Sequence, residues 1–515
     1  MNSKLKSPKN VDLSLNSGRL NLLKQRLVGN DIISDGNNSN QARDSSSSFG
    51  VSDNTNTDTS SLPSRSNSVT IHIDNPKKTT EEDQYKIELK RQLREKNDKQ
   101  FEEMMQFTIN CLFEFNMDKQ KIKAIELSEK YEKLGHIITS ISGAEKWCGG
   151  TDAEILERDI EILTQEIDSF KKKDQHKKFD TSSSRKSCLQ ALLKEKKASQ
   201  KQLEVERSIF KNLLLNNYYQ LQSEYKVNQA LDKERYILTE FSGRGGCSEV
   251  WKAFDKKKIR YVAIKIQKMD PKWSDATKHN FIKHMGREIT IMESTQHQNV
   301  IEYYERFYIA EDIIAIVMEY CDGGDLSTML KKRGKIPEKE AKLILAQTMS
   351  GLIALRSKHM YVIHYDLKPG NILFNDEGVV KITDFGLSKI IEGNAPSIEL
   401  TSQGTGTYFY AAPETFQRGA NVSITKSVDT WPLGIIFFEM IYGVRPFDGG
   451  QSQITFSEQI DTLVGEVQFP QAPKLSQEGQ NFIKTCLIKN PLDRPELPIL
   501  MQDSYIKQII EDMNS

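Results

Sequence analysis

The chain has 515 residues, of which 37% are apolar and 28% are charged, and 71 Lys and Arg residues balance 71 Asp and Glu residues. This length exceeds what one hydrophobic core usually organises, so we expect one large folded domain and a second region of another kind. The even charge excludes an argument for nucleic acid or a membrane surface as a partner, and the apolar stretches are too short to cross a bilayer. Residues 1–10 lack a signal-peptide core, so we expect a soluble, intracellular protein.

The cysteines indicate a reducing compartment. No two of the six cysteines stand at the C-x-x-C spacing of a metal site, and no cluster of histidines accompanies them. We therefore interpret them as reduced thiols, which fits the cytosol or the nucleus. They are Cys111, Cys148, Cys188, Cys247, Cys321 and Cys486.

Residues 1–79 form the first region by composition. Between residues 30 and 70 the sequence consists mainly of Ser, Asn, Asp, Gly and Thr, with almost no apolar side chains to bury. Such a segment cannot offset the entropy lost on folding. We predict a disordered Ser/Asn-rich tail.

Residues 80–234 predict long α-helices, because they are rich in Glu, Lys and Gln, contain no proline and place apolar residues at helical spacing. The clearest stretch follows Gly149-Gly150 and a capping box from Thr151 to Glu154. Its apolar residues alternate in steps of four and three, which is typical of a coiled-coil seam. The seam residues are Leu156, Ile160, Leu163, Ile167 and Phe170.

A second helical stripe is less regular and drifts towards an eleven-residue repeat. It comprises Leu203, Phe210, Leu214, Tyr218, Leu221 and Tyr225, and a break at residues 171–187 separates it from the first seam. Sustained seams without tight turns favour association with another chain, so we expect a homo-oligomer through this coiled-coil region. The alternative is a helical hairpin within one chain that packs the same stripes together.

Residues 236–507 change to short β-branched strands, glycine turns and longer helical patterns, which predicts a mixed α+β domain. A glycine-rich segment, residues 243–250, lies between two predicted strands, 236–241 and 250–254. A second strand follows it, whereas a dinucleotide-binding fold requires a helix. Glycines there let backbone N–H groups close over phosphates, although a plain tight hairpin would show the same pattern.

Two charged residues downstream are suited to a nucleotide site. The strand Val262-Ala263-Ile264-Lys265 ends in a lysine whose ammonium group can neutralise the α- and β-phosphates. Glu288, on the amphipathic helix that follows, is the natural ion-pair partner of this lysine. Taken alone, these residues would be a snorkelling lysine and a surface glutamate.

The strongest pattern is the segment 364–371, His-Tyr-Asp-Leu-Lys-Pro-Gly-Asn, followed closely by Asp-Phe-Gly at 384–386. Asp366 can accept the proton of a substrate hydroxyl, and Lys368 can contact a transferring phosphoryl group. Asn371 and Asp384 supply the hard oxygen ligands that Mg²⁺ requires. No structural role alone explains this set of residues.

These motifs occur in the order found in protein kinases and end with Ala412-Pro413-Glu414, so residues 236–507 resemble a eukaryotic protein kinase domain. More narrowly, the segments 243–255, 363–373, 382–389 and 399–404 resemble the tousled-like kinases, as does the insertion around Trp273 and His284. The layout of a disordered tail, a coiled coil and a kinase domain is similar to that family's too.

The resemblance implies a bilobal kinase fold that uses ATP and Mg²⁺. It implies a gatekeeper at Met318, hinge residues at Glu319 and Cys321, and a ribose contact at Asp325. Asp366 and Lys368 are then catalytic, and Asn371 and Asp384 bind the metal. The expected ATP-binding residues are Gly243, Gly245, Gly246, Val250, Ala263, Lys265, Glu288, Met318, Glu319, Cys321 and Asp325.

The same resemblance assigns the activation segment and its supports. Lys368 and Thr407 stand where serine/threonine kinases carry them, and the expected activation-segment residues are Thr401, Ser402, Thr405 and Thr407. Asp429 is expected to anchor the catalytic loop, and Arg494 is expected to pair with Glu414. Three positions depart from the general kinase pattern, and one of them, Pro432, lies near the start of the helix after Asp429, where proline is tolerated. Tyr365 replaces the arginine that often holds an activation-loop phosphate, and Cys247 replaces an aromatic loop tip, for which ordinary packing is the favoured interpretation.

By resemblance, the enzyme phosphorylates Ser and Thr of protein substrates in the nucleus, among them a histone chaperone of the anti-silencing class, in chromatin assembly. Without the resemblance, the cytoplasm is equally compatible with the sequence. No membrane partner and no direct nucleic-acid binding are evident. The alternative is an inactive kinase-fold scaffold that works through its coiled coil, but every residue whose loss defines such scaffolds is present.

Overall fold

The structure, a computed structural model, describes residues 81–139, 145–173, 181–356, 360–392, 395, 397–399, 408–416, 423–447 and 467–514. The predicted disordered tail, residues 1–79, lies outside this range. The chain divides into two units, Met1–Gln84 and Tyr85–Ser515, and the features below belong to the second. Within the described ranges, no helix combines the length and the apolar composition that a membrane span requires.

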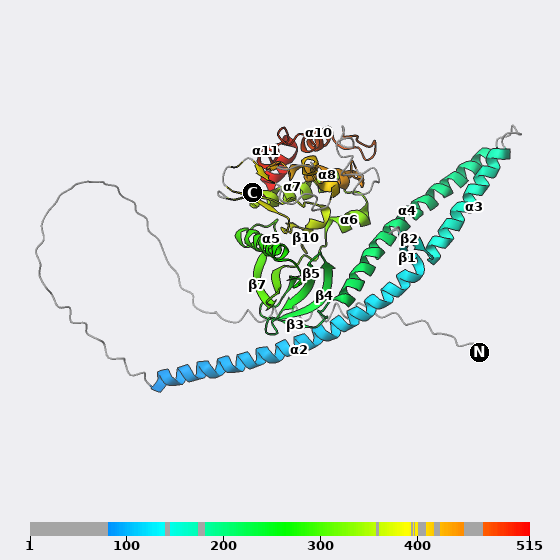
Figure 1. The fold of residues 1–515 in the computed structure, drawn as a ribbon. Helices are drawn as coiled ribbons and strands as arrows, with labels where there is room; N and C mark the ends of the chain where they lie inside the picture. The colour runs from blue at the N-terminus through cyan, green and yellow to red at the C-terminus, as the bar shows by residue number, and fades with distance from the viewer. Residues whose placement is uncertain are drawn as a thin grey trace, which may run out of the picture. The chain divides into compact units, whose positions relative to one another are not determined.

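The region before the α+β domain consists of three long helices and a small hairpin (Figure 1). Helix α2 (Glu81–Leu134) leads into strands β1 (His136–Thr139) and β2 (Glu145–Cys148), and helices α3 (Thr151–Lys173) and α4 (Thr181–Gln222) follow. Gly150 has a φ of 99°, and a Cβ there would meet the backbone of Leu134, so glycine is required where the hairpin returns to α2. This close approach directs α3 away from the end of α2.

Helices α3 and α4 pack against each other within the chain. Ile167 of the predicted seam is 5% exposed, and the seam residues Leu156, Ile160 and Leu163 are half-buried. An ion pair of 2.6 Å between Lys196 and Asp159 joins the two helices. The single chain therefore has the intrachain packing that the sequence left as the alternative, and association of this seam with a second chain stays a prediction. The side chain of Phe170 lies outside the described residues.

The second stripe does not continue as one buried seam. Phe210 is buried against the ring of Trp147 from β2, with the ring centroids 6.3 Å apart. Tyr218 and Leu221 are instead 57% and 70% exposed. The stripe ends because the last turns of α4 leave α3 and approach the α+β domain, where other residues of the helix make the contacts.

The smaller lobe of the α+β domain is an antiparallel sheet of six strands in the order β3-β4-β5-β6-β8-β7. Side chains alternate between its faces, so Val262, Ile264 and Ile266 join one apolar cluster while Ala263 joins the other. The same alternation points Lys265 to the Ala263 face. The strands are β3 (Ala230–Leu231), β4 (Tyr236–Arg244), β5 (Ser248–Asp255), β6 (Arg260–Lys268), β7 (Tyr303–Ala310) and β8 (Ile313–Glu319), and helix α5 (Asp275–Ser294) covers the Ala263 face.

The larger lobe is mainly helical and surrounds α8 (Thr430–Tyr442), which is buried along almost its whole length. One apolar core runs from α5 through this lobe to α12. Among the described residues, its other helices are α6 (Leu326–Arg333), α7 (Glu338–Ala354), α10 (Gln477–Cys486), α11 (Leu497–Leu500) and α12 (Ser504–Asn514). Its short strands are β9 (Met360–Ile363), β10 (Ile372–Phe374), β11 (Val380–Ile382), β12 (Lys389–Glu392), β13 (Ser397–Glu399) and β14 (Ser423–Thr425). The expected bilobal α+β fold preceded by helices is confirmed.

Replacing Ile167 by aspartate should separate α3 from α4, because a carboxylate cannot be buried in this apolar contact without a partner. We expect backbone amides of both helices to exchange with solvent at least about a hundredfold faster. Hydrogen exchange measures this. Ile162, which is 50% exposed on the same helix, provides the control Ile162→Asp, for which little change is expected. Equal protection in the two variants would contradict the packing described.

Candidate functional site

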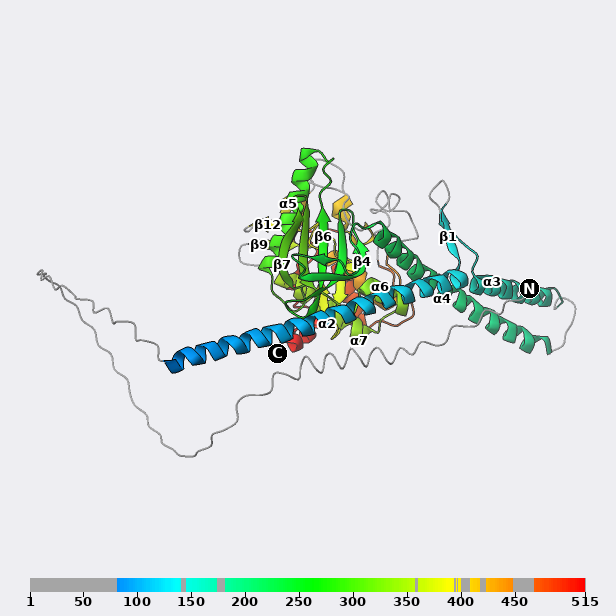
Figure 2. The ribbon, with the colours of Figure 1, turned by 90° about the horizontal axis from the view of Figure 1, so that it is seen from below.

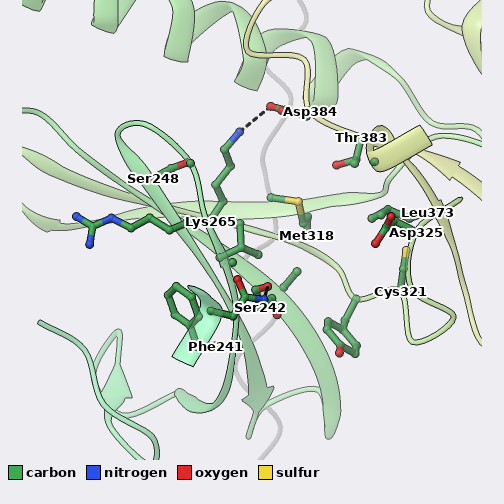
Figure 3. A pocket seen from close by; sticks show the side chains of 18 of the residues that line it. Phe241, Ser242, Ser248, Lys265, Met318, Cys321, Asp325, Leu373, Thr383 and Asp384 are labelled. Carbon is green, nitrogen blue, oxygen red and sulfur yellow. Dashed lines mark hydrogen bonds and ion pairs between the residues drawn. The ribbon is translucent and has the colours of Figure 1, made fainter. Parts of the chain in front are cut away.

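A cavity of about 1200 Å³ lies between the sheet and the larger lobe (Figure 3). The glycine-rich turn between β4 and β5 covers it, and Ala263, Lys265 and Met318 come from the sheet below. The backbone N–H of Gly245 donates to the carbonyl of Ser248 at 2.8 Å and closes the turn. A Cβ on Gly243 or Gly246 would meet nothing within 4 Å, so the chain itself does not require glycine there. Open space beside these residues is what a bound phosphate needs.

Lys265 joins two carboxylates inside the cavity. Its Nζ lies 2.5 Å from Oε1 of Glu288 and 3.1 Å from Oδ1 of Asp384. Glu288 is buried on α5, and its second oxygen accepts a hydrogen bond from Gln267 at 2.9 Å. The ion pair predicted between Lys265 and Glu288 is therefore confirmed. This arrangement fixes α5 against the sheet and aligns the lysine with the cavity.

The charges of this cluster reinforce one another. Burial by itself would lower the pKa of Lys265, but the carboxylates of Glu288 and Asp384 outweigh burial and raise it above its ordinary value. The charge of Lys265 in turn lowers the pKa of Asp384, although burial opposes this. Both groups are charged at neutral pH. Asp384 is thus an ionised carboxylate at the edge of the cavity.

The catalytic loop predicted at residues 364–371 holds its polar groups close together. Lys368 Nζ lies 2.6 Å from Oδ2 of Asp366, and the side-chain nitrogen of Asn371 donates to the backbone carbonyl of Asp366 at 2.8 Å. Asp429 accepts hydrogen bonds from the backbone N–H groups of His364 and Tyr365, at 2.7 and 2.9 Å, as the sequence predicts. Tyr365 has a φ of 67°, which L-residues rarely adopt. The buried carboxylate of Asp429 stabilises that conformation.

Asn371 and Asp384 fit the metal that protein kinases use. The amide nitrogen of Asn371 is engaged by Asp366, so its oxygen is the ligand atom, and Asp384 is held ionised by Lys265. A carboxylate and an amide oxygen are hard donors of the kind that Mg²⁺ requires. Phe385, buried beside the ring of His364, fixes the backbone that carries Asp384.

The predicted adenine and ribose contacts line the cavity, but several also serve other purposes. Glu319 forms an ion pair of 2.8 Å with Lys381, and its backbone N–H donates to the carbonyl of Glu302 at 2.9 Å, so the carbonyl is the group of Glu319 that can face a base. Both carboxylate oxygens of Asp325 accept hydrogen bonds from Thr328 and cap α6. Burial raises the pKa of Cys321 to about 12, so this thiol is neutral. Met318 and Val250 pack with the apolar core beside the cavity.

Of the remaining predictions, Arg494 and Glu414 form the expected buried ion pair, with nitrogen–oxygen distances of 2.8 and 3.0 Å. Cys247 is exposed, so the favoured interpretation that it packs in the loop tip is wrong: it lies at the tip of the turn that covers the cavity and lines the cavity with its neighbours. The four activation-segment residues Thr401, Ser402, Thr405 and Thr407 lie outside the described residues.

Two groups of site residues were missed by sequence reasoning. His284 and Arg287, four and one positions before Glu288 on α5, donate to the carbonyls of Gly386 and Ser388 at 3.2 and 3.0 Å. His284 and Arg287 are three positions apart on α5 and therefore share a face, which could have indicated a common contact. The second group lines the cavity from α2 and α4, outside the predicted domain, and no sequence motif marks it. It comprises Lys119, Gln120, Ile122, Lys123, Glu126, Leu213 and Asn216.

Comparison with known proteins agrees with this geometry. A family model described as the protein kinase domain matches residues 236–506. The serine/threonine-protein kinase TOUSLED of Arabidopsis thaliana is 35% identical over 399 residues, which are 76% of this chain and 55% of the relative. Serine/threonine-protein kinase tousled-like 1 of Mus musculus is 41% identical over 301 residues, which are 57% of this chain and 39% of the relative. Serine/threonine-protein kinase tousled-like 1 of Caenorhabditis elegans is 42% identical over 284 residues, which are 53% of this chain and 29% of the relative.

The chain belongs to the protein kinase family, because the family model covers more than half of it. The narrower resemblance to tousled-like kinases is confirmed by these relatives, each of which is named as a serine/threonine-protein kinase. The chain spans only 29–55% of the length of these three relatives. The match to the plant protein, at 399 residues, is longer than the kinase domain and extends into the helices before it.

Lys265 and Glu288 should act as one unit, because the lysine is held in position only while the glutamate is docked. We expect Lys265→Met and Glu288→Gln each to lower kcat/KM for ATP by about a hundredfold or more, and the double variant to lose little further. Steady-state kinetics of the unmodified chain, the two single variants and the double variant complete a double-mutant cycle. Lys257→Met, in the exposed turn after β5, is the matched control. Losses that multiply in the double variant would refute the coupling.

Proposed function

We propose that this chain transfers the γ-phosphate of Mg·ATP to Ser or Thr hydroxyls of protein substrates. The single observation that carries the proposal is the convergence of Lys265, Asp384 and the catalytic loop on one cavity beneath the glycine-rich turn. Lys265 binds the α- and β-phosphates, and the adenine lies between Ala263 and Leu373, with the hinge backbone at residues 319–321 beside it.

In the transfer step, the substrate hydroxyl oxygen forms a bond to the γ-phosphorus while the bond from that phosphorus to the bridging oxygen of ADP breaks. Asp366 orients the hydroxyl and accepts its proton. Lys368, 2.6 Å from Asp366, is placed to neutralise charge on the transferring phosphoryl group. Mg²⁺, when bound by Asn371 and Asp384, would supply further charge neutralisation at the phosphates. Every other contribution comes from residues of the chain.

The substrate and the compartment are proposed from the tousled-like resemblance alone. On that basis, the substrates include a histone chaperone of the anti-silencing class, and the enzyme works in the nucleus in chromatin assembly. Phosphorylation of purified chaperone compared with a general substrate at equal concentration tests this, and equal kcat/KM for both would count against the assignment.

We further propose that two copies of the chain associate through α2. In the single chain α4 covers the α3 seam, whereas α2 keeps Phe101, Met104 and Phe115 exposed at coiled-coil spacing. Exposed apolar residues in a heptad register are what a second copy of the same helix would cover. Two kinase domains joined in this way have a high local concentration of each other and favour phosphorylation in trans.

Asp366→Asn should abolish phosphate transfer, by about a thousandfold or more, while nucleotide affinity stays within about threefold, because this carboxylate faces the hydroxyl rather than the phosphates. Asp384→Ala should instead weaken Mg·ATP binding itself. Radiolabelled transfer and nucleotide titration measure the two effects. Asp376→Asn, in the exposed turn between β10 and β11, is the control. Equal loss of nucleotide affinity in both variants would be inconsistent with these roles.

Replacing Phe101, Met104 and Phe115 together by glutamate should yield monomers, because charge on the stripe prevents helix pairing. We expect autophosphorylation to fall at a concentration where the unmodified chain is assembled. Sedimentation and a kinase assay on the same samples measure this, with Glu103→Gln, an exposed position next to Met104, as the control. Unchanged assembly of the triple variant would show that the α2 stripe is not the interface between copies.

A further inference from the structure

Helix α2 carries a second stripe that faces the kinase domain. Its members recur in steps of four and three, and they are Met105, Ile109, Leu112, Asn116, Lys119 and Lys123. The apolar half packs on the sheet, where Met105 joins Ile237 of β4 and Phe254 of β5 in one buried cluster. Helix α2 runs past β4 (Figure 2). The polar half continues along the helix to the cavity.

A buried polar contact fixes the register of α2 on the domain. Asn116, only 3% exposed, donates to the side-chain oxygen of Asn228 at 2.8 Å, and Asn228 donates back to the carbonyl of Phe113 at 3.3 Å. The backbone N–H of Asn228 then donates to the carbonyl of Leu238 on β4 at 2.7 Å. A displaced helix would leave these buried amides without partners, which is costly. Helix α2 is therefore linked to β4 in a single register.

The contact continues to the glycine-rich turn. Lys119 Nζ lies 2.6 Å from Oε2 of Glu240 on β4, four residues before Arg244, where the strand ends. Lys123, one turn further, donates to Gln220 of α4 at 3.2 Å, and burial lowers its pKa. Both lysines line the same cavity as Lys265. The helix thus forms part of the wall of the nucleotide site.

Helix α4 holds the other strand of the turn. Ser223, buried just after its last residue, donates to Oε2 of Glu249 on β5 at 2.5 Å. Asn216 on the same helix reaches the carbonyl of Ser242 on β4 at 3.4 Å. Beyond the turn, Lys268 of β6 forms an ion pair of 2.7 Å with Glu224. Both strands that carry the turn are therefore attached to residues that lie outside the kinase domain match, 236–506.

We propose that α2 and the end of α4 act as a brace that positions the glycine-rich turn for nucleotide binding, with Lys119, Asn116 and Ser223 as positioning residues. A hairpin free of such contacts samples many positions, and the nucleotide must restrict it on binding. The brace restricts the position of the turn before the nucleotide binds, so nucleotide affinity depends on helices outside the catalytic domain. This inference rests on the proposed kinase function. It adds that the helical region before the domain controls how tightly the kinase site binds nucleotide.

Reversing one charge of the Lys119–Glu240 pair tests the brace in the full chain. We expect Lys119→Glu, and separately Glu240→Lys, to weaken binding of a fluorescent ATP analogue about three- to tenfold, with KM for ATP rising alike and kcat within about twofold. The double exchange should restore affinity to within about twofold, and the effect should shrink at high salt. Lys121→Glu is the control, because Lys121 is exposed and pairs only with Asp118 of its own helix among the ion pairs described.

A second variant tests the buried contact. Asn228 has a φ of 68°, which glycine adopts freely, so Asn228→Gly removes the side chain without straining the backbone. We expect a loss of nucleotide affinity at least as large as that of Lys119→Glu, with unchanged sedimentation and a lower midpoint of thermal unfolding, because Asn116 loses its buried partner. Unchanged affinity in this variant and in both charge reversals, or a double exchange that does not restore it, would overturn the brace.

The readouts separate this proposal from the kinase function. Nucleotide titration does not require phosphate transfer, so a chain that binds ATP through the brace but transfers no phosphate would refute the proposed function alone. A chain that transfers phosphate with the same nucleotide affinity in all variants would refute the brace alone. Measurement of oligomeric state on the same samples excludes an indirect effect through assembly, since Asn116 and Lys119 face the domain rather than the exposed α2 stripe.

Discussion

The contact between Lys265 and Glu288 is the constraint on which the rest of the site depends. It joins the sheet to α5 through an ion pair of 2.5 Å, and it leaves the lysine within 3.1 Å of Asp384. Removing either partner of a buried pair leaves an uncompensated charge, which typically costs about 3–5 kcal/mol. The intact pair adds little net stability, because taking both charges out of water offsets most of their attraction. Its effect is on specificity, because only one docking of α5 satisfies it.

The same principle of paired buried groups recurs around the cavity. Asp429 fixes the catalytic loop through two backbone N–H groups, Arg494 pairs with Glu414 within the larger lobe, and Asn116 with Asn228 sets the register of α2. Each contact determines where one segment lies relative to another. Catalytic groups from distant parts of the sequence therefore meet in one geometry rather than in a range of geometries.

Much of this site could be predicted because the motifs are short and local. The loop from His364 to Asn371 carries its chemistry within eight residues, and the alternation along β6 alone determines which face receives Lys265. The long-range pairs were predictable only through family resemblance, as for Arg494. The helices offered no such guide: their spacing indicated seams, but it did not show that α3 would pack on α4 or that α2 would dock beside the glycine-rich turn.

The sequence by itself determined the class of the domain, the candidate catalytic and metal-binding side chains and the presence of long amphipathic helices, because these depend on residue type and on spacing along the chain. The tertiary structure decided which partner each apolar stripe has, that Cys247 is exposed and that Lys119 and Lys123 belong to the nucleotide cavity. These outcomes depend on competition between surfaces. A heptad stripe has no intrinsic preference between a second copy, a neighbouring helix and a sheet, and only the packing of the whole chain selects among them.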